Sequence, residues 1–156
     1  MAPRSLKPAY LLLLVACGEP PLSPNVAWIP ITGSTIVQSN LSDFSASTRL
    51  VVGDTGTWRT IWPKLHGVPT PPVPRVDFAN TTILLAALGG RGTGGYSITI
   101  DSIARQDGRL LVHVTEVSPG RSCGVTEAIT LPVHVFLLFE PVATVDWKAS
   151  ARELRC

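Results

Sequence analysis

The sequence has few charged residues and no block of one charge sign. Lys, Arg, Asp and Glu make up 15% of its 156 residues, and the formal net charge is +2. Arg4 and Lys7 precede the first apolar run, and the 13 cations less these two equal the 11 acidic residues in number. This balance excludes the basic footprint of a nucleic-acid-binding domain and the polybasic segment that binds an anionic membrane surface. With 45% hydrophobic residues, the chain predicts a globular core.

The sequence also lacks several short motifs that carry catalysis or metal binding. It contains no H-E-x-x-H, C-x-x-C or S-x-x-K pattern. Its histidines, His66, His113 and His134, are widely spaced. His113 and Glu116 are three residues apart, which on a strand sends the two side chains to opposite faces. We therefore expect no metal, no cofactor and no enzymatic activity.

Residues 1–16 predict a lipoprotein signal peptide. Arg4 and Lys7 come before an apolar run that is far shorter than the about 20 residues needed to span a bilayer. The run ends in Leu14-Val15-Ala16-Cys17, which resembles a bacterial lipobox, in which the cysteine receives diacylglycerol and becomes the new amino terminus. Several acyl chains make a stable anchor, so the prediction is a cell-envelope protein tethered to a membrane. The alternative is an ordinary signal peptide with a chance cysteine.

The remainder of the chain predicts one domain behind a tether. Residues 17–33 are rich in proline, which favours extended backbone over helix. We expect the domain over residues 34–147 and a tail over residues 148–156.

Hydrophobic patterning predicts a mainly β domain. Residues 83–88 form an apolar run with the length of a buried strand, whereas residues 96–103 alternate, with Tyr96, Ile98, Ile100 and Ser102 expected on one face. Asp107-Gly108 is typical of a hairpin turn. The short links between strands favour a mostly antiparallel sheet. We expect this sheet to curl into a small barrel or sandwich. The predicted fold class is therefore mainly β, a β-rich α+β fold with one short helix. The expected strands are residues 48–52, 82–88, 96–103, 110–117, 133–139 and 143–147.

A helix is predicted near residues 58–65, because apolar residues there are spaced to fall on one helical face: Trp58, Ile61, Trp62 and Leu65. Asp54, Thr55 or Thr57 could cap this helix, but Pro63 removes a hydrogen bond, so we expect it to be short or kinked. The tryptophans either cover the open face of the sheet or form a ligand cage. The four prolines in residues 65–75 predict a loop without ladder bonds.

The segment Gly90–Gly95 fits the dinucleotide-binding spacing G-x-G-x-x-G. Phosphate binding by this motif needs a following helix, whose amino terminus supplies free N–H groups, and here a strand is expected instead. We therefore predict no nucleotide site. Gly94 and Gly95 are expected to shape a tight turn with positive φ.

The cysteines leave two alternatives. If Cys17 carries lipid, Cys123 and Cys156 remain in an oxidising compartment, where two thiols can form one disulfide. In the other alternative Cys123 is a reactive thiol and Cys156 lies at a frayed end.

Several motifs follow one another in a specific order. They are Trp58-x-x-x-Trp62, Pro74-Arg75-Val76-Asp77-Phe78, Gly92-Thr93-Gly94-Gly95-Tyr96-Ser97-Ile98, Pro119-Gly120 with Cys123, and Thr130-Leu131-Pro132. In this order they resemble the carboxyl-terminal domain of the protease complex subunit PrcB family over roughly residues 34–147. The motif positions carried over, with a structural or binding role, are Trp58, Trp62, Asp77, Phe78, Thr93, Gly94, Gly95 and Tyr96. We expect the Asp77 carboxylate to accept backbone N–H bonds beside a buried Phe78 ring.

The resemblance implies a noncatalytic, protein-binding accessory role. The family is named after a lipoprotein associated with a subtilisin-like surface protease, so the implied partner is a secreted or surface protease. The alternative function is an envelope lipoprotein that binds a small ligand or polymer. A sheet edge open to an extended peptide favours the first function, and a deep apolar pocket lined by tryptophans favours the second.

Lipidation at Cys17 is directly testable. Cys17→Ser removes the thiol that would carry diacylglycerol, so it should abolish acyl labelling and shift the protein out of the membrane fraction. A Cys17→Ser protein that keeps both its label and its membrane partitioning would contradict the lipobox interpretation.

Overall fold

The computed structural model describes residues 33–106 and 109–156. The predicted signal peptide, the lipid site at Cys17, nearly all of the tether and the Asp107-Gly108 turn lie outside these residues. No helix in the described part combines the length and the apolar character needed to cross a membrane. The elements are β1 (Gly33–Ser39), β2 (Thr48–Val52), α1 (Thr55–Ile61), the 3-10 helix η1 (Trp62–Leu65), β3 (Thr82–Ala87), β4 (Ser97–Gln106), β5 (Arg109–Pro119), β6 (Val133–Leu138) and β7 (Val145–Leu154).

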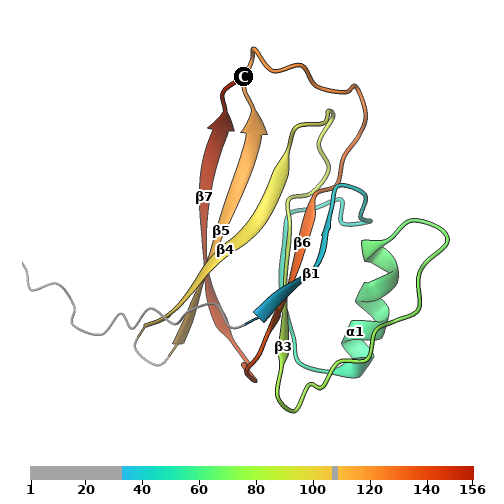
Figure 1. Ribbon diagram of the computed structural model, residues 1–156, viewed down its shortest axis with the longest axis vertical. Coiled ribbons are helices and arrows are strands. Elements are labelled where there is room, and N and C mark those ends of the chain that lie inside the picture. Colours follow the sequence, from blue (N-terminus) through green and yellow to red (C-terminus); the bar gives the residue numbers. More distant parts are fainter. Residues whose placement is uncertain (1–32, 107–108) are drawn as a thin grey trace, which may run out of the picture.

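The strands form two sheets packed as a sandwich, with α1 on the outside. One sheet has four strands in the order β1-β6-β3-β2, and the other has three in the order β4-β5-β7. Figure 1 shows the four-stranded sheet in the middle, with α1 on one side and the three-stranded sheet on the other. The predicted fold class is confirmed, as a sandwich and not a closed barrel.

Strand β3 belongs to both hydrophobic cores. Ile83 and Leu85 pack in the core beneath α1, whereas Leu84 and Ala86 pack in the core between the sheets. All six residues of the strand are buried. This explains why the sequence here is a continuous apolar run, since a strand covered on both faces has no polar side.

The helix is short and changes type at the proline, as predicted. Asp54 is the N-cap, and its carboxylate accepts a 2.8 Å hydrogen bond from the Thr57 N–H. The α-helix ends at Ile61, and Trp62 and Pro63 begin the 3-10 turn η1. Capping and proline placement therefore fix both ends of the α-helix.

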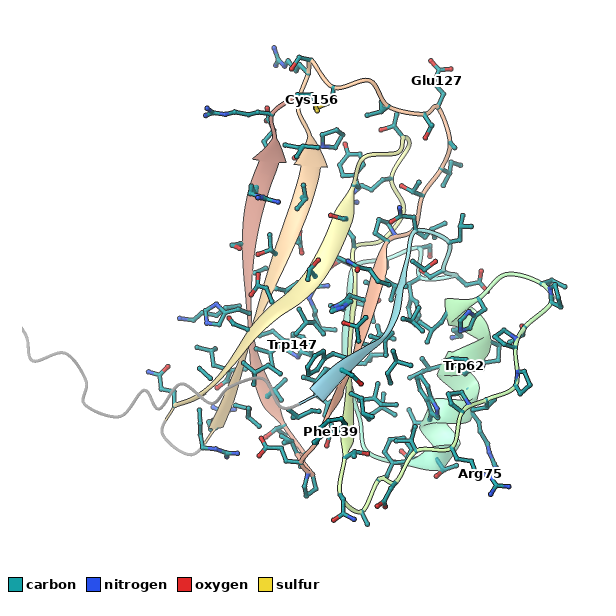
Figure 2. All side chains as sticks on the ribbon, in the orientation of Figure 1. Trp62, Arg75, Glu127, Phe139, Trp147 and Cys156 are labelled. Atoms are coloured by element: carbon teal, nitrogen blue, oxygen red, sulfur yellow. A yellow bond between two sulfur atoms is a disulfide. The ribbon has the colours of Figure 1, made fainter. Side chains whose placement is uncertain are left out.

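Both tryptophans of this segment are buried against the four-stranded sheet. Trp58 is 1% exposed and Trp62 is 6% exposed, and their rings pack edge to face with centroids 5.1 Å apart. Their indole N–H groups donate to the proline-rich loop, from Trp58 to the Pro74 carbonyl at 3.2 Å and from Trp62 to the Pro71 carbonyl at 2.8 Å. Figure 2 labels Trp62 on the helical segment, on the side of the molecule where this loop runs. The tryptophans thus cover the sheet and fasten the loop, which contains no strand.

The carboxyl-terminal strand differs from the prediction in length and direction. It continues to Leu154, so residues 148–154 belong to the sheet and are not a tail beyond the domain. It also runs parallel to β5, in an otherwise antiparallel architecture. The chain leaves β6 in the other sheet and crosses back before β7 begins, which brings it in beside β5 in the same direction. The later half of β7 is exposed and largely polar, so it lacks the alternation of buried and exposed residues by which a strand is predicted.

Two further differences concern β4 and β1. A register shift at Asp101 lets Ile103 point into the core at 2% exposure, so Ser102 does not continue the face of Ile98 and Ile100. Strand β1 was not predicted, because it is a polar edge strand with its own register shift between Thr35 and Val37.

Trp62→Ala should destabilise the domain strongly. The change opens a cavity in the core and removes the bond to the Pro71 carbonyl, and replacing a buried tryptophan by alanine costs about 3–5 kcal/mol. Denaturant unfolding measures the loss, with Trp62→Phe as the control that keeps most of the packing. An unchanged midpoint for Trp62→Ala would contradict the assigned packing.

Candidate functional site

The glycine-rich segment connects β3 to β4, and its conformation is fixed. Gly89 and Gly95 both have φ of 84°, a region that favours glycine. Gly94 does not share this conformation, contrary to the prediction of positive φ at both positions. A Cβ at Gly94 would instead meet the Thr126 hydroxyl, which would have to rotate away. At Gly95 a Cβ would also lie 2.9 Å from the Pro119 Cβ.

The backbone of this segment pairs with the loop that follows β5. Arg91 and Thr130 exchange two backbone hydrogen bonds of 2.8 and 2.9 Å, and the Gly94 N–H donates to the Thr126 carbonyl at 2.9 Å. The Thr130 hydroxyl donates to the Thr93 carbonyl at 2.9 Å. The Arg91 guanidinium lies over the Tyr96 ring, 5.7 Å from its centroid. These contacts hold the β3–β4 connection against the loop after β5. The glycine-rich segment therefore serves to connect two strands.

Asp77 and Phe78 order the turn before β3. The Asp77 carboxylate accepts a hydrogen bond from the Ala79 N–H at 3.1 Å and another from the Asn80 side-chain amide at 2.8 Å. Phe78 is half-buried against the core beneath α1. The predicted carboxylate turn is present, in the form of an Asx turn.

The family-motif residues therefore gather in two places and not in one site. The two tryptophans and Phe78 pack in the core beneath α1, with Asp77 at the turn beside it. Thr93, Gly94, Gly95 and Tyr96 lie where the β3–β4 connection meets the loop after β5. Both groups shape loops around the sandwich.

Cys123 and Cys156 form a disulfide. It links the loop after β5 to Cys156, two residues beyond β7, next to a 3.0 Å backbone hydrogen bond from the Gly120 N–H to the Leu154 carbonyl. Of the two alternatives for these cysteines, the structure contains the bridge. The end of β7 is thereby fastened to its neighbour β5.

The three histidines lie apart. His66 packs against Trp62 with ring centroids 4.3 Å apart, and His113 lies on β5 in the three-stranded sheet. His134 is on β6, 3% exposed between the two sheets. Within residues 33–106 and 109–156, no group of three or more His, Cys, Asp or Glu side chains could hold a metal ion.

His134 joins the two sheets, a role that sequence reasoning missed. The Ile100 N–H on β4 donates to His134 Nδ1 at 2.9 Å, and His134 Nε2 lies 3.0 Å from the Thr35 hydroxyl on β1. Because Nδ1 accepts, the neutral ring carries its proton on Nε2 and can donate it to Thr35. Burial lowers the pKa of His134 below its ordinary value, since the charged ring would lose its hydration.

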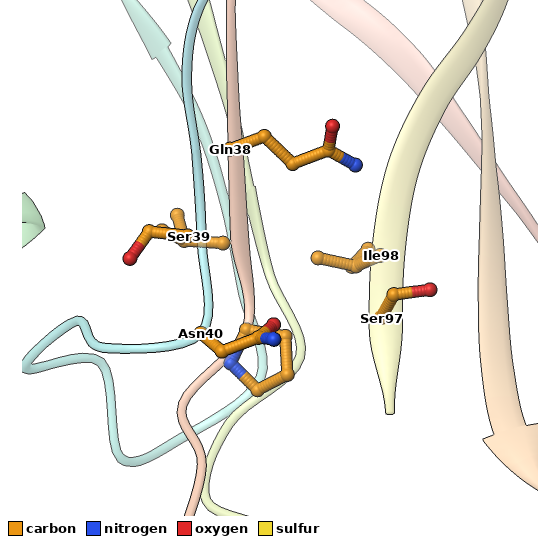
Figure 3. A pocket seen from close by; sticks show the side chains of 7 residues that line it. Gln38, Ser39, Asn40, Ser97 and Ile98 are labelled. Atoms are coloured by element: carbon orange, nitrogen blue, oxygen red, sulfur yellow. The ribbon is translucent and has the colours of Figure 1, made fainter. Parts of the chain in front are cut away.

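Two of the surface clefts in the described part of the chain bear on a ligand site, and neither is a deep pocket walled by exposed tryptophan. A shallow cleft of about 530 Å³ runs between α1 and the proline-rich loop, with Arg59 and Arg75 at its walls. A smaller one of about 190 Å³ lies between β1 and β4; Figure 3 shows Gln38 and Ile98 pointing toward each other across it. Trp58 borders the first cleft but is only 1% exposed. The clefts therefore lack the apolar tryptophan walls expected of a ligand cage.

Residues 82–137 match the family described as PrcB C-terminal. This confirms the resemblance to the PrcB family over the stretch from β3 through most of β6. No curated protein and no solved structure matches the chain. The matched segment includes the glycine-rich connection and His134, while Trp58, Trp62, Asp77 and Phe78 lie before it.

Gly95→Ala should lower the free energy of unfolding by more than about 1 kcal/mol, because alanine is strained at φ of 84°. Gly92→Ala is the matched control, since nothing lies within 4 Å of a Cβ at that position. Denaturant midpoints compare the two. Equal stability of the Gly95 and Gly92 variants would refute the assigned backbone conformation.

His134 makes folding stability depend on pH. Its folded-state pKa is lowered, so the unfolded chain takes up the proton first as pH falls. The free energy of unfolding should therefore be highest above the unfolded-state pKa of about 6.5. As pH falls from there toward the lower folded-state pKa, it should decrease by at most about 1.4 kcal/mol per pH unit. Denaturant unfolding at stepped pH measures this slope. His134→Gln should flatten it and His113→Gln should not; the reverse result would refute the assignment.

Proposed function

We propose that this protein is a noncatalytic accessory subunit or regulator of a secreted or surface protease. The observation that carries the proposal is the match of residues 82–137 to the PrcB C-terminal family, whose name points to a protease complex subunit. The fold supports a binding role, because the residues of the family motifs order loops around a sandwich. A partner would bind to the surface of this sandwich.

We further propose that the protein acts at the cell envelope, anchored by lipid on Cys17. The support is the Leu14-Val15-Ala16-Cys17 pattern after a short apolar run. The disulfide between Cys123 and Cys156 is consistent with such an oxidising compartment. Anchoring would keep the domain close to a membrane-associated partner and raise the effective concentration of the pair.

The alternative of a ligand-binding envelope lipoprotein has less support. That function predicts a deep apolar pocket lined by tryptophans. Trp58 and Trp62 lie instead in the core, with their N–H groups bound to the carbonyls of the proline-rich loop. We therefore favour a protein partner over a small ligand.

Affinity capture tests the proposed function. The tagged full chain, taken from detergent-solubilised membranes of its own cells, should enrich a protease over an identically tagged lipoprotein of unrelated fold. The Cys17→Ser chain serves as the anchor control and should recover less of the same protease, because it no longer shares the membrane. Enrichment of other proteins only, with no protease among them, would contradict the proposal.

A further inference from the structure

Strand β7 forms one of the two edges of the three-stranded sheet. It pairs with β5 over all ten residues from Val145 to Leu154, and the sheet order places it at the end. Within residues 33–106 and 109–156, no strand pairs with its other side. A strand in this position carries a row of backbone N–H and C=O groups that an incoming strand can use. Figure 1 shows β7 at the outer margin of the sandwich.

The other three edge strands are shorter or irregular, and β7 is neither. Strand β2 has five residues, β1 shifts register between Thr35 and Val37, and β4 shifts register at Asp101. Short length and bulges are devices that protect an edge from pairing. Strand β7 keeps an unbroken register with β5 and contains no proline. Its backbone is the one best suited to accept another strand.

The outward face of β7 has a defined charge pattern. Lys148, Ser150 and Arg152 share one face, since side chains alternate along a strand and the Ser150 hydroxyl lies 3.2 Å from that of Thr115 on β5. Both cations are exposed, and neither forms an ion pair with a described residue. Asp146, on the same face, is already paired with Arg109 at 3.1 Å. The free charge on this face is therefore positive at two positions four residues apart.

The far end of β7 is fixed before any partner arrives. The disulfide of Cys156 and the bond between the Gly120 N–H and the Leu154 carbonyl attach the end of the strand to the loop after β5. A preordered edge loses less conformational entropy on binding than a free carboxyl-terminal segment would. The opposite face of β7 is anchored by Trp147, which packs in the core between the sheets (Figure 2).

We propose that the β7 edge binds an extended segment of a partner protein as an added strand, and that this segment carries carboxylates at positions i and i+4. The two carboxylates would lie opposite Lys148 and Arg152, where opposite charges on directly facing positions stabilise pairing. This inference rests on the proposed accessory function, for which it names the surface and the chemistry of the partner segment. A second copy of the chain fits less well, because antiparallel self-pairing centred on Ser150 would place Lys148 opposite Arg152.

A synthetic peptide tests this binding mode. The probe is Thr-Glu-Val-Thr-Val-Glu-Val-Thr, whose glutamates are four residues apart on one face, and the comparison peptide has lysine at both glutamate positions. Fluorescence anisotropy with the full chain should show binding of the glutamate peptide only. Lys148→Glu/Arg152→Glu should weaken it about tenfold or more, because two attractive cross-strand pairs become repulsive. Arg59→Glu/Lys64→Glu is the matched control, with the same charge change on α1 and η1, and should leave the affinity within about twofold.

Backbone pairing is tested separately from charge. Two versions of the glutamate peptide carry N-methyl groups on alternate amides, so that only one version blocks the N–H groups that face β7. Loss of binding by one version and retention by the other supports an added strand. Equal binding of both versions, or equal weakening by the two double variants, would overturn the proposal.

Self-association of the free chain, abolished by Lys148→Glu/Arg152→Glu in sedimentation velocity, would also overturn it, since a second copy would then occupy the edge. If the peptide does not bind but a protease is still captured, the strand-addition proposal is refuted and the accessory function is retained. Peptide binding without a captured protease would refute the accessory function alone.

Discussion

The burial of β3 on both faces is the constraint on which the rest of the structure depends. Its residues supply one side of the core beneath α1 and one side of the core between the sheets. Covering the first side requires the tryptophan helix, and covering the second requires the three-stranded sheet. The indole bonds to Pro71 and Pro74 extend this arrangement into the proline-rich loop. A substitution in β3 should therefore disturb the packing of α1 on one side and of the three-stranded sheet on the other.

Polar contacts align the two sheets. His134 accepts the Ile100 N–H near the register shift of β4, and Arg49 on β2 bonds to the Glu116 carboxylate on β5 at 2.5 Å. Arg49 also donates to the Ala87 carbonyl at 2.7 Å. Dispersion and hydrophobic burial hold the sheets together without strong orientation, whereas these directional bonds select one alignment. The alignment leaves the last strand at the margin of its sheet with an open edge.

Local sequence signals predicted the elements whose packing follows from their own residues. The apolar run of β3, the period of Trp58, Ile61 and Trp62, and the effect of Pro63 all depend on neighbours in the chain. Features set by contacts between distant residues could not be predicted. These are the burial of Ile103 after the register shift of β4, the parallel pairing of β7 with β5, and the hydrogen bond by which His134 joins the two sheets. A buried histidine is recognised only when its partners on other strands are known. The candidate edge shares this difficulty, because exposure of β7 depends on sheet order.

Native-state amide hydrogen exchange tests the central claim, that a doubly covered strand organises a sandwich whose last strand is open. The account predicts the slowest exchange in β3 and β6, at a rate set by global unfolding. It predicts fast exchange in alternate amides of β7, whose N–H groups face the free edge, even though the disulfide fixes the end of that strand. Uniform protection along β7 equal to that of β3, in the free monomeric chain, would contradict the account.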